Sequence, residues 1–230
     1  MSDWTLTWLG HSGFRIKVGG RVLLLDPWLR GNPSFPEDRF DEAVDGATHI
    51  LLSHAHSDHA SSAVEIAGKT GAVVVAIYEL ANFLATEGAI GLNKGGTVDL
   101  GGVAATLVHA VHSSSMPVDG RPVYLGAEAG WMIEAGGETL YFMGDTDVFA
   151  DMGLLAELHA PKWGIVPIGG HFTMDARRAA FACGKFFDFE AVIPCHYGTF
   201  PLLEQTAEGF AQAMAPTRVI APKVMEAVTL

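Results

Sequence analysis

Cysteine is scarce in this sequence, and long apolar runs are missing. The 230 residues include only Cys183 and Cys195, and nothing in the sequence supports a disulfide between them, so we expect a reducing, cytoplasmic location. No run approaches the roughly 18 consecutive apolar residues of a membrane-spanning helix, so no membrane association is expected. The opening segment, MSDWTLTWLGHSGF, has neither a basic start nor a long apolar stretch, so we also expect no signal peptide.

Basic residues are few as well. Lysine and arginine total 14 against 26 acidic residues, a formal net charge of −12, and no basic run occurs. A nucleic-acid-binding surface needs a basic patch, so a small-molecule substrate is a more natural partner than nucleic acid. Whether the protein forms a homo-oligomer is left open by the sequence. The hydrophobic content of 49% and the 27 glycines suit a well-buried α/β protein with one large or two small domains.

The most informative stretch is residues 48–60, THILLSHAHSDHA. Its apolar first part predicts a short buried strand, and the residues that follow the stretch predict a helix. Between the two lie His54, His56, Asp58 and His59. They therefore occupy a loop at the carboxyl end of a strand, which is where α/β sheets place their ligands.

This cluster predicts a metal site. Charged imidazoles would repel one another, whereas neutral imidazoles with a carboxylate form a ligand set suited to zinc and neighbouring metals. His54 and His56 can point to one side of an extended segment, while Asp58 and His59 follow the turn and can point to a second position. The spacing therefore indicates two metal ions. The alternative, a solvated histidine-rich loop, is disfavoured because the loop follows a buried strand.

Apolar alternation and glycine turns predict the other elements. Helices are expected at residues 61–69, 175–187 and 202–215, and a strand followed by a helix within 72–86. Strands are expected at residues 4–10, 14–18, 21–26, 103–112, 123–134, 138–143, 163–170, 190–196 and 217–222. Residues 27–46 are rich in proline, glycine and aspartate and are expected to form a long loop. These patterns alone indicate only an α/β or α+β fold.

Further histidines and aspartates fall at the ends of expected strands, namely Asp26, His112, Asp145, His171 and His196. Asp26 could accept a hydrogen bond from a metal-binding imidazole, and a carboxylate in a strand-end turn is the alternative. His112 is favoured over His109 as a ligand, because His112 sits where the strand gives way to serines. Gly144 before Asp145 lets the backbone approach closely and projects the carboxylate from the rim.

The HAHSDH segment resembles the HxHxDH signature of the metallo-β-lactamase superfamily. The segments WLGHSGF, PIGGHFTMD and PCHYGTFP resemble those of its stand-alone small hydrolases, the group that includes the ascorbate-6-phosphate lactonase-like proteins. The resemblance runs in order from Asp26 to His196. It implies a four-layer αββα sandwich, in which residues 1–230 form a single metallo-hydrolase domain of two similar halves, with metals at the edge between the sheets.

The resemblance also implies a set of metal ligands: His54, His56, Asp58, His59, His112, Asp145 and His196. His54, His56 and His112 would hold one divalent ion. Asp58, His59 and His196 would hold a second, and Asp145 would bridge both. Asp26 would orient one of the imidazoles from behind. The ions would be zinc in the simplest case, with manganese or iron as alternatives.

The resulting hypothesis is a metal-dependent hydrolase. A hydroxide shared by the two ions would attack a small, anionic ester, lactone or phosphodiester. Asp58 and Asp145 would serve this chemistry directly, and His11 and His171, which the resemblance places near the active site, are the candidates to protonate the leaving group. Two alternatives remain: a nuclease or phosphodiesterase, which the acidic composition disfavours, and an iron-binding protein of oxygen chemistry or sensing.

Overall fold

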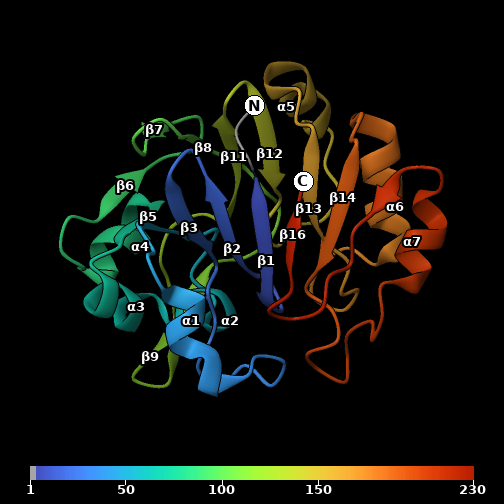
Figure 1. Ribbon diagram of the computed structural model, residues 1–230. Helices are drawn as coiled ribbons and strands as arrows, with labels where there is room; N and C mark the ends of the chain where they lie inside the picture. The colour runs from blue at the N-terminus through green and yellow to red at the C-terminus, as the bar shows by residue number, and fades with distance from the viewer. Residues whose placement is uncertain (1–3) are drawn as a thin grey trace.

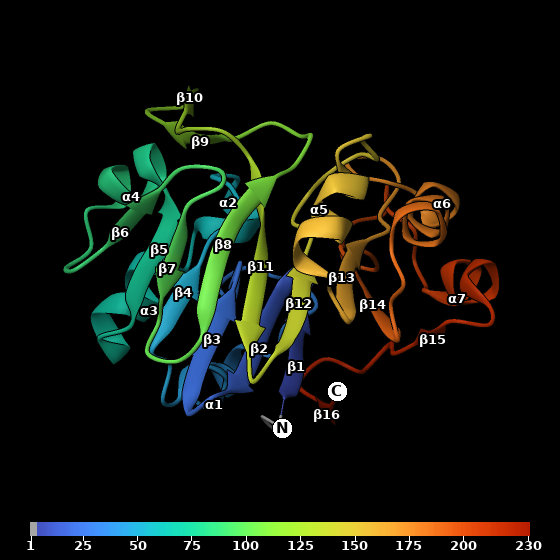
Figure 2. The ribbon, with the colours of Figure 1, turned by 90° about the horizontal axis from the view of Figure 1, so that it is seen from above.

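The computed structural model describes residues 4–230 (Figure 1). The first three residues, which belong to the segment considered for a signal peptide, lie outside this range. Two large sheets stand face to face (Figure 2). Among the described residues, no helix is long and apolar enough to cross a membrane.

The first sheet has seven strands in the order β16-β1-β2-β3-β4-β5-β6. Their bounds are β1 Thr5–Gly10, β2 Gly13–Val18, β3 Arg21–Leu25, β4 His49–Leu51, β5 Val73–Ile77, β6 Ile90–Leu92 and β16 Ala227–Thr229. Strands β1 to β3 are antiparallel neighbours, whereas β3 to β6 run parallel. The carboxyl ends of β3 and β4 therefore meet at one edge of the sheet.

The second sheet also has seven strands, in the order β15-β14-β13-β12-β11-β8-β7. Their bounds are β7 Thr97–Asp99, β8 Ala104–His109, β11 Ala129–Ala135, β12 Glu138–Phe142, β13 Trp163–Pro167, β14 Ala191–Cys195 and β15 Arg218–Val219. Strands β12 to β15 run parallel, and β12, β11, β8 and β7 are antiparallel neighbours. A separate hairpin pairs β9, Ser115–Val118, with β10, Arg121–Tyr124.

Helices cover the outer sides of the two sheets (Figure 2). The first sheet carries α3, Ala63–Thr70, and α4, Tyr78–Leu84, and the second carries α5, Met152–His159, α6, Ala176–Phe186, and α7, Glu208–Met214. Two short helices, α1 at Phe40–Val44 and α2 at Ser57–Ala60, lie near the end of the sandwich where β3 and β4 stop (Figure 1). The four-layer arrangement expected from the resemblance is therefore observed.

Aromatic side chains join the sheets across the core. Phe14 on β2 meets Phe142 on β12 edge to face at 6.4 Å between ring centroids, and Trp4 meets Trp163 at 5.5 Å. Strand β14 is buried along its whole length, because its sheet is covered on both faces. Such strands are apolar throughout instead of alternating, which is why AVIPC was recognisable as a strand from its sequence.

Several boundaries differ from the sequence expectation. The loop at 27–46 contains a 3-10 turn, Glu37–Arg39, and helix α1. The helix expected at 202–215 is confined to α7, because the loop before it folds back on itself. In that loop the Gly198 N–H donates to the Glu204 carbonyl, and the Gln205 amide donates to the carbonyls of Phe200 and Leu203.

The strand expected at 123–134 begins only at Ala129, since Arg121–Tyr124 pairs with β9. The strand expected at 217–222 is two residues long, and the chain ends instead in β16, which pairs with β1 in the other sheet. The sequence did not predict that the chain returns to the first sheet, because Ala227–Thr229 is too short to show a periodic pattern.

Candidate metal centre

The strand ends bring the expected site residues to one place. Asp26 directly follows β3, His54 follows β4 by three residues, Asp145 follows β12 by three, and His196 directly follows β14. The two sheets meet here through the backbone, since the His196 N–H donates to the His11 carbonyl at 3.0 Å. Residues far apart in the chain therefore share one edge of the sandwich.

The first group of donors consists of His54, His56 and His112, whose ring nitrogens lie within 4.8 Å of one another. His54 Nε2 lies 3.0 Å from His56 Nδ1. Burial lowers the pKa of His54 well below its ordinary value, and charge on His59 lowers it further. Burial also lowers the pKa of His56 and His112. Neutral imidazoles whose lone pairs converge form a ready cation site.

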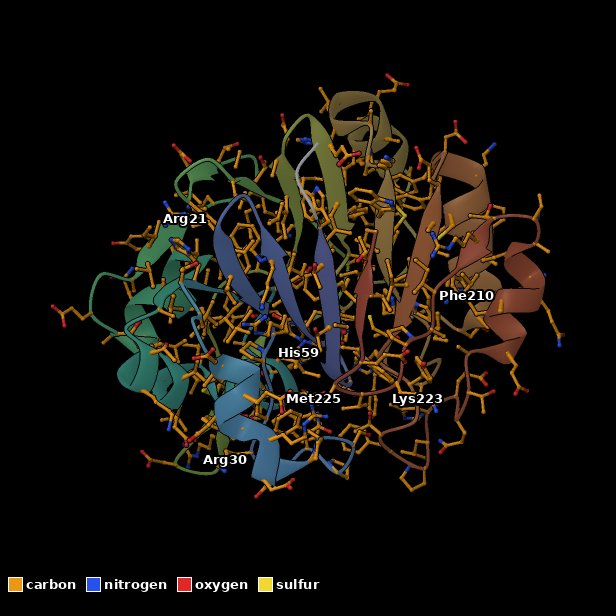
Figure 3. The ribbon with its side chains drawn as sticks, viewed as in Figure 1. Arg21, Arg30, His59, Phe210, Lys223 and Met225 are labelled. Carbon is orange, nitrogen blue, oxygen red and sulfur yellow. The ribbon has the colours of Figure 1, made fainter. Side chains whose placement is uncertain are left out.

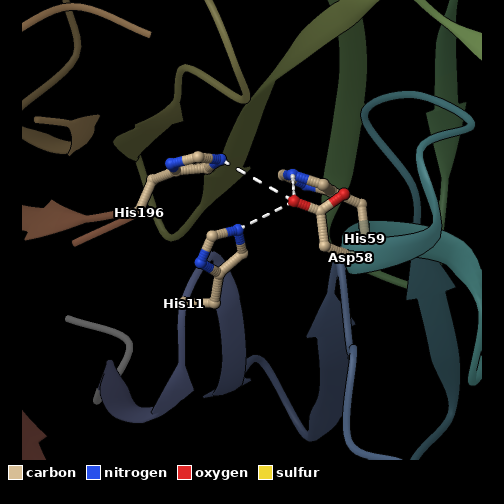
Figure 4. A group of neighbouring side chains, drawn as sticks. All are labelled: His11, Asp58, His59 and His196. Atoms are coloured by element: carbon tan, nitrogen blue, oxygen red, sulfur yellow. Dashed lines mark hydrogen bonds and ion pairs between the residues drawn. The ribbon is translucent and has the colours of Figure 1, made fainter. Parts of the chain in front are cut away.

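The second group consists of Asp58, His59 and His196, and His11 joins it. Asp58 Oδ2 lies 3.0 Å from His11 Nε2, 3.8 Å from His59 Nε2 and 3.9 Å from His196 Nε2 (Figure 4). Burial raises the pKa of Asp58, but His59 and the hydrogen bond with His11 outweigh it and hold that pKa below its ordinary value. Asp58 is therefore ionised and available to a cation.

Asp145 stands between the two groups. Its Oδ2 lies 3.5 Å from His112 Nε2 in the first group, and 3.3 Å and 2.9 Å from the Nε2 atoms of His59 and His196 in the second. Burial raises the pKa of Asp145, but His196 and His59 outweigh this and hold it well below its ordinary value. Gly144 permits this placement, since a Cβ there would lie 2.5 Å from the Ala129 carbonyl oxygen.

Asp26 fixes the orientation of two imidazole rings from behind the site. Its Oδ2 accepts from His59 Nδ1 at 2.7 Å and also from the Ser53 hydroxyl. Because that hydroxyl gives its single proton to Asp26, it accepts the Nδ1–H of His54 at 2.9 Å. Both rings thus carry their proton on Nδ1 and turn Nε2 toward the site. Ser53 was not singled out from the sequence; its position directly before His54 was the available signal.

The buried polar atoms fit a bound cation. Among the described residues, His59 Nε2 and Asp145 Oδ1 are buried without a hydrogen-bond partner, and each such atom costs roughly 1–3 kcal/mol when left unsatisfied. Burial lowers the pKa of His59, but Asp145, Asp58 and Asp26 raise it well above its ordinary value. A divalent cation would take the place of the additional proton that this raised pKa keeps on the His59 ring. It would also give His59 Nε2 and Asp145 Oδ1 the partner that they lack.

The two candidates for proton donation are placed differently. His11 lies within the cluster, is fully buried, and has partners on both ring nitrogens, Thr199 Oγ1 and Asp58 Oδ2, each at 3.0 Å. Burial and the nearby His196 lower the pKa of His11 to about 4. His171 is exposed on the loop after β13 and lines a separate depression with Glu204 and Gln205. The structure therefore does not bring His171 into the cluster.

A cavity of about 800 Å³ opens onto the site. His56, Asp58, His112, Asp145 and His196 are among the residues that line it. Asp147 does not line this cavity; its carboxylate accepts from the Val148 N–H and pairs with Arg178. The two cysteines are free and buried, so no disulfide braces the site.

The fold and the clustered histidines and aspartates define a metallo-hydrolase of the β-lactamase superfamily. The family model described as the beta-lactamase superfamily domain matches residues 5–196, and the chain belongs to this superfamily. A UPF0173 metal-dependent hydrolase of Cereibacter sphaeroides is 55% identical over 228 residues, which cover 98% of this chain and 99% of the relative. A relative of the same description from Dinoroseobacter shibae is 54% identical over the same shares. The chain is thus a metal-dependent hydrolase.

Solved structures agree with this assignment. The structure of Igni18, a metallo hydrolase from Ignicoccus hospitalis, superposes with a TM-score of 0.88 at 34% identity and covers 99% of this chain and 98% of that one. The metallo-β-lactamase fold protein YhfI from Bacillus subtilis superposes with a TM-score of 0.75 at 14% identity, with full coverage of both chains. The second similarity concerns the fold alone.

Proposed function

We propose that this hydrolase holds two divalent cations, zinc in the simplest case and manganese or iron as alternatives. His54, His56 and His112 would hold one, Asp58, His59 and His196 the other, and Asp145 would contact both. The observation that carries the proposal is the position of Asp145 Oδ2, within 3.5 Å of ring nitrogens from both histidine groups. One carboxylate shared by two groups of imidazoles is the donor set of a binuclear site.

Cations bound there would lower the pKa of a coordinated water to about 7 and stabilise negative charge that develops on the substrate. Other residues of the chain hold the candidate metal ligands in position. Asp26 holds His59 directly and His54 through Ser53, and His11 holds Asp58. Because His54, His59 and Asp58 are fixed from behind, their donor atoms need little reorganisation when substrate arrives.

The reaction that we propose is hydrolysis of a small ester, lactone or phosphodiester in the 800 Å³ cavity. His11 is buried with both nitrogens engaged, so we assign it a positioning role and no direct proton transfer. Asp58 retains 27% of its side-chain exposure and faces the cavity. It is therefore the carboxylate best placed to exchange a proton with a substrate that lies in this cavity.

Metal analysis of single variants tests the two-cation proposal. We expect two ions per chain in the wild type, and loss of one in His112→Ala and of one in His196→Ala. His159→Ala on α5 is the matched control, since this histidine lies outside the clusters, and it should retain two ions. Full stoichiometry in both site variants, or a single ion in the wild type, would refute the arrangement.

Activity assays test the reaction. Metal-reconstituted protein should hydrolyse members of a panel of esters and lactones and should lose that activity when a chelator removes the metal. Bis(p-nitrophenyl) phosphate in the same panel separates phosphodiester from carbonyl chemistry. Elemental analysis and the absorbance spectrum of the purified protein decide between zinc and iron.

A further inference from the structure

One wall of the cavity is apolar. It is formed by Trp28, Phe172, Phe200, Pro201 and Leu202, which line the same cavity as the histidines and aspartates of the metal centre. These five side chains come from three loops, which follow β3, β13 and β14. The wall therefore begins where the candidate metal ligands end, and a molecule in the cavity contacts both.

The inner part of the wall is rigidly tied to the metal centre. Trp28 and Phe200 stack at 5.8 Å between ring centroids with an interplanar angle of 26°, and the ring of His11 meets each of them edge to face at 5.4 Å. The Trp28 N–H also donates to the Asp26 carbonyl at 2.8 Å. This aromatic surface is thus preorganised instead of forming around a ligand.

The outer part of the wall is exposed. Phe172 retains 50% of its accessible surface and Leu202 retains 64%. Large apolar side chains that are exposed together at the mouth of a cavity mark a binding surface more often than isolated ones do. An apolar group lying against Phe172 and Leu202 would remove their surface from water, which favours binding.

Positive charge is missing from the cavity. Among the residues that line it in the described part of the chain there is no lysine or arginine. Two arginines on adjoining segments are engaged elsewhere: Arg30 pairs with Glu65 at 2.9 Å, and Arg178 pairs with Asp147 at 3.3 Å. Figure 3 shows Arg30 at the edge of the molecule, well away from His59. A second negative group on the substrate would find no partner along this wall.

We propose that the part of the substrate that does not react is uncharged and apolar, an alkyl or aryl group that lies along Trp28, Phe200, Phe172 and Leu202. This deepens the proposed function and rests on it for the position of the reacting carbonyl at the metal centre. It reverses the expectation of an anionic substrate that the sequence suggested. Phosphorylated lactones and esters are disfavoured, and acyl derivatives of medium chain length are favoured.

Binding of hydrolysis products tests this inference without turnover. Calorimetry on the zinc-reconstituted protein compares acetate, butanoate, hexanoate and adipate; adipate matches hexanoate in length but carries a charge at its far end. We expect affinity to rise about threefold per added methylene from acetate to hexanoate, and hexanoate to bind at least about tenfold more tightly than adipate. Affinity that is independent of chain length, absence of alkanoate binding, or preference for adipate would each overturn the inference.

Variants locate the binding surface. Phe172→Ala and Leu202→Ala remove exposed side chains and should weaken hexanoate about threefold to tenfold while acetate and the metal content stay unchanged. Phe181→Ala on α6, also exposed at 58%, is the matched control and should bind hexanoate like the wild type. Equal weakening of acetate and hexanoate in the two wall variants would contradict the placement.

The proposed function and this inference fail separately. Hexanoate binding that follows the expected pattern, combined with no hydrolysis of hexanoyl esters or lactones, refutes the hydrolysis proposal and leaves the apolar wall intact. Hydrolysis of phosphorylated lactones in preference to hexanoyl ones supports the hydrolysis proposal. It refutes the inference that the non-reacting part of the substrate is apolar and lies along the wall.

Discussion

The backbone N–H of His196 donates to the carbonyl oxygen of His11 at 3.0 Å, and both residues have positive φ angles, 58° and 53° respectively. Residues other than glycine adopt this conformation at a cost and do so mainly where surrounding structure requires it. Asp26, with φ of 41°, shares it. The three strand ends are thus turned sharply so that their side chains face the metal centre.

His11→Ala should weaken one of the two metal positions selectively. Its removal frees the Asp58 carboxylate from a 3.0 Å partner, and loss of such a support typically costs about 10–100-fold in metal affinity. Chelator competition should show this loss at the Asp58, His59 and His196 position only. Thr199→Val, which removes the partner on the other nitrogen of His11, should show a smaller loss of the same kind. If His11→Ala lost the same amount of affinity at both metal positions, relative to the wild type, the positioning role would be contradicted.

Asp26→Ala and Ser53→Ala should differ in the number of metal positions that they weaken. Asp26 fixes His59 directly and His54 through the serine hydroxyl, so its removal should weaken both metal positions, by about 10–100-fold. Ser53→Ala leaves the Asp26–His59 contact in place and should weaken only the position that contains His54. The check is again titration of each ion against a chelator; identical profiles for the two variants would show that the tautomer of His54 is set by something else.

Gly169→Ala should destabilise the protein and disturb His196. A Cβ at this position would overlap the His196 carbonyl oxygen and lie 2.9 Å from its Nδ1, and overpacking of this kind costs about 1–3 kcal/mol. Gly184→Ala in α6 is the control, because nothing lies within 4 Å of the added methyl, and it should raise stability by up to about 1 kcal/mol. Thermal unfolding and zinc content measure both effects. Wild-type zinc affinity in Gly169→Ala would show that His196 tolerates the shift.

Stability should fall with rising pH above about pH 9. Burial raises the pKa of the Cys183 thiol from 9.0 to about 12, so the unfolded chain releases this proton first. The unfolded state then binds fewer protons than the folded state, and the free energy of unfolding decreases as pH rises between these values, by up to about 1.4 kcal/mol per pH unit for one group. Burial raises the pKa of Cys195 in the same direction.

Urea unfolding of the wild type and of Cys183→Ala between pH 7 and pH 10.5 checks this expectation. The variant starts from lower stability because it loses buried volume, but its decline above pH 9 should be less steep. Parallel declines in the two proteins would show that the Cys183 thiol makes no contribution to the alkaline loss.

Local sequence was sufficient to place most of the strands, though not β9, β10 or β16, and to expect the ligands near the strand ends. The buried strand before His54 is recognisable from its apolar run, and Gly144 before Asp145 indicates a close backbone approach. These features depend on residues within a few positions of one another, where periodicity and turn chemistry act. The superfamily signature of residues 54–59 then suggested the four-layer fold, which the structure bears out.

The arrangement of side chains within the site depended on tertiary structure. His11 contacts Thr199, 188 positions later, and Trp28 stacks on Phe200, because the two sheets, formed apart from β16 by residues 5–92 and 97–219, meet at one edge. His171 carries the same strand-end pattern as His196 yet lies outside the cluster. Sequence pattern determined which residues leave the strands, whereas packing of the sheets decided which of them face one another, since that choice rests on contacts between distant segments.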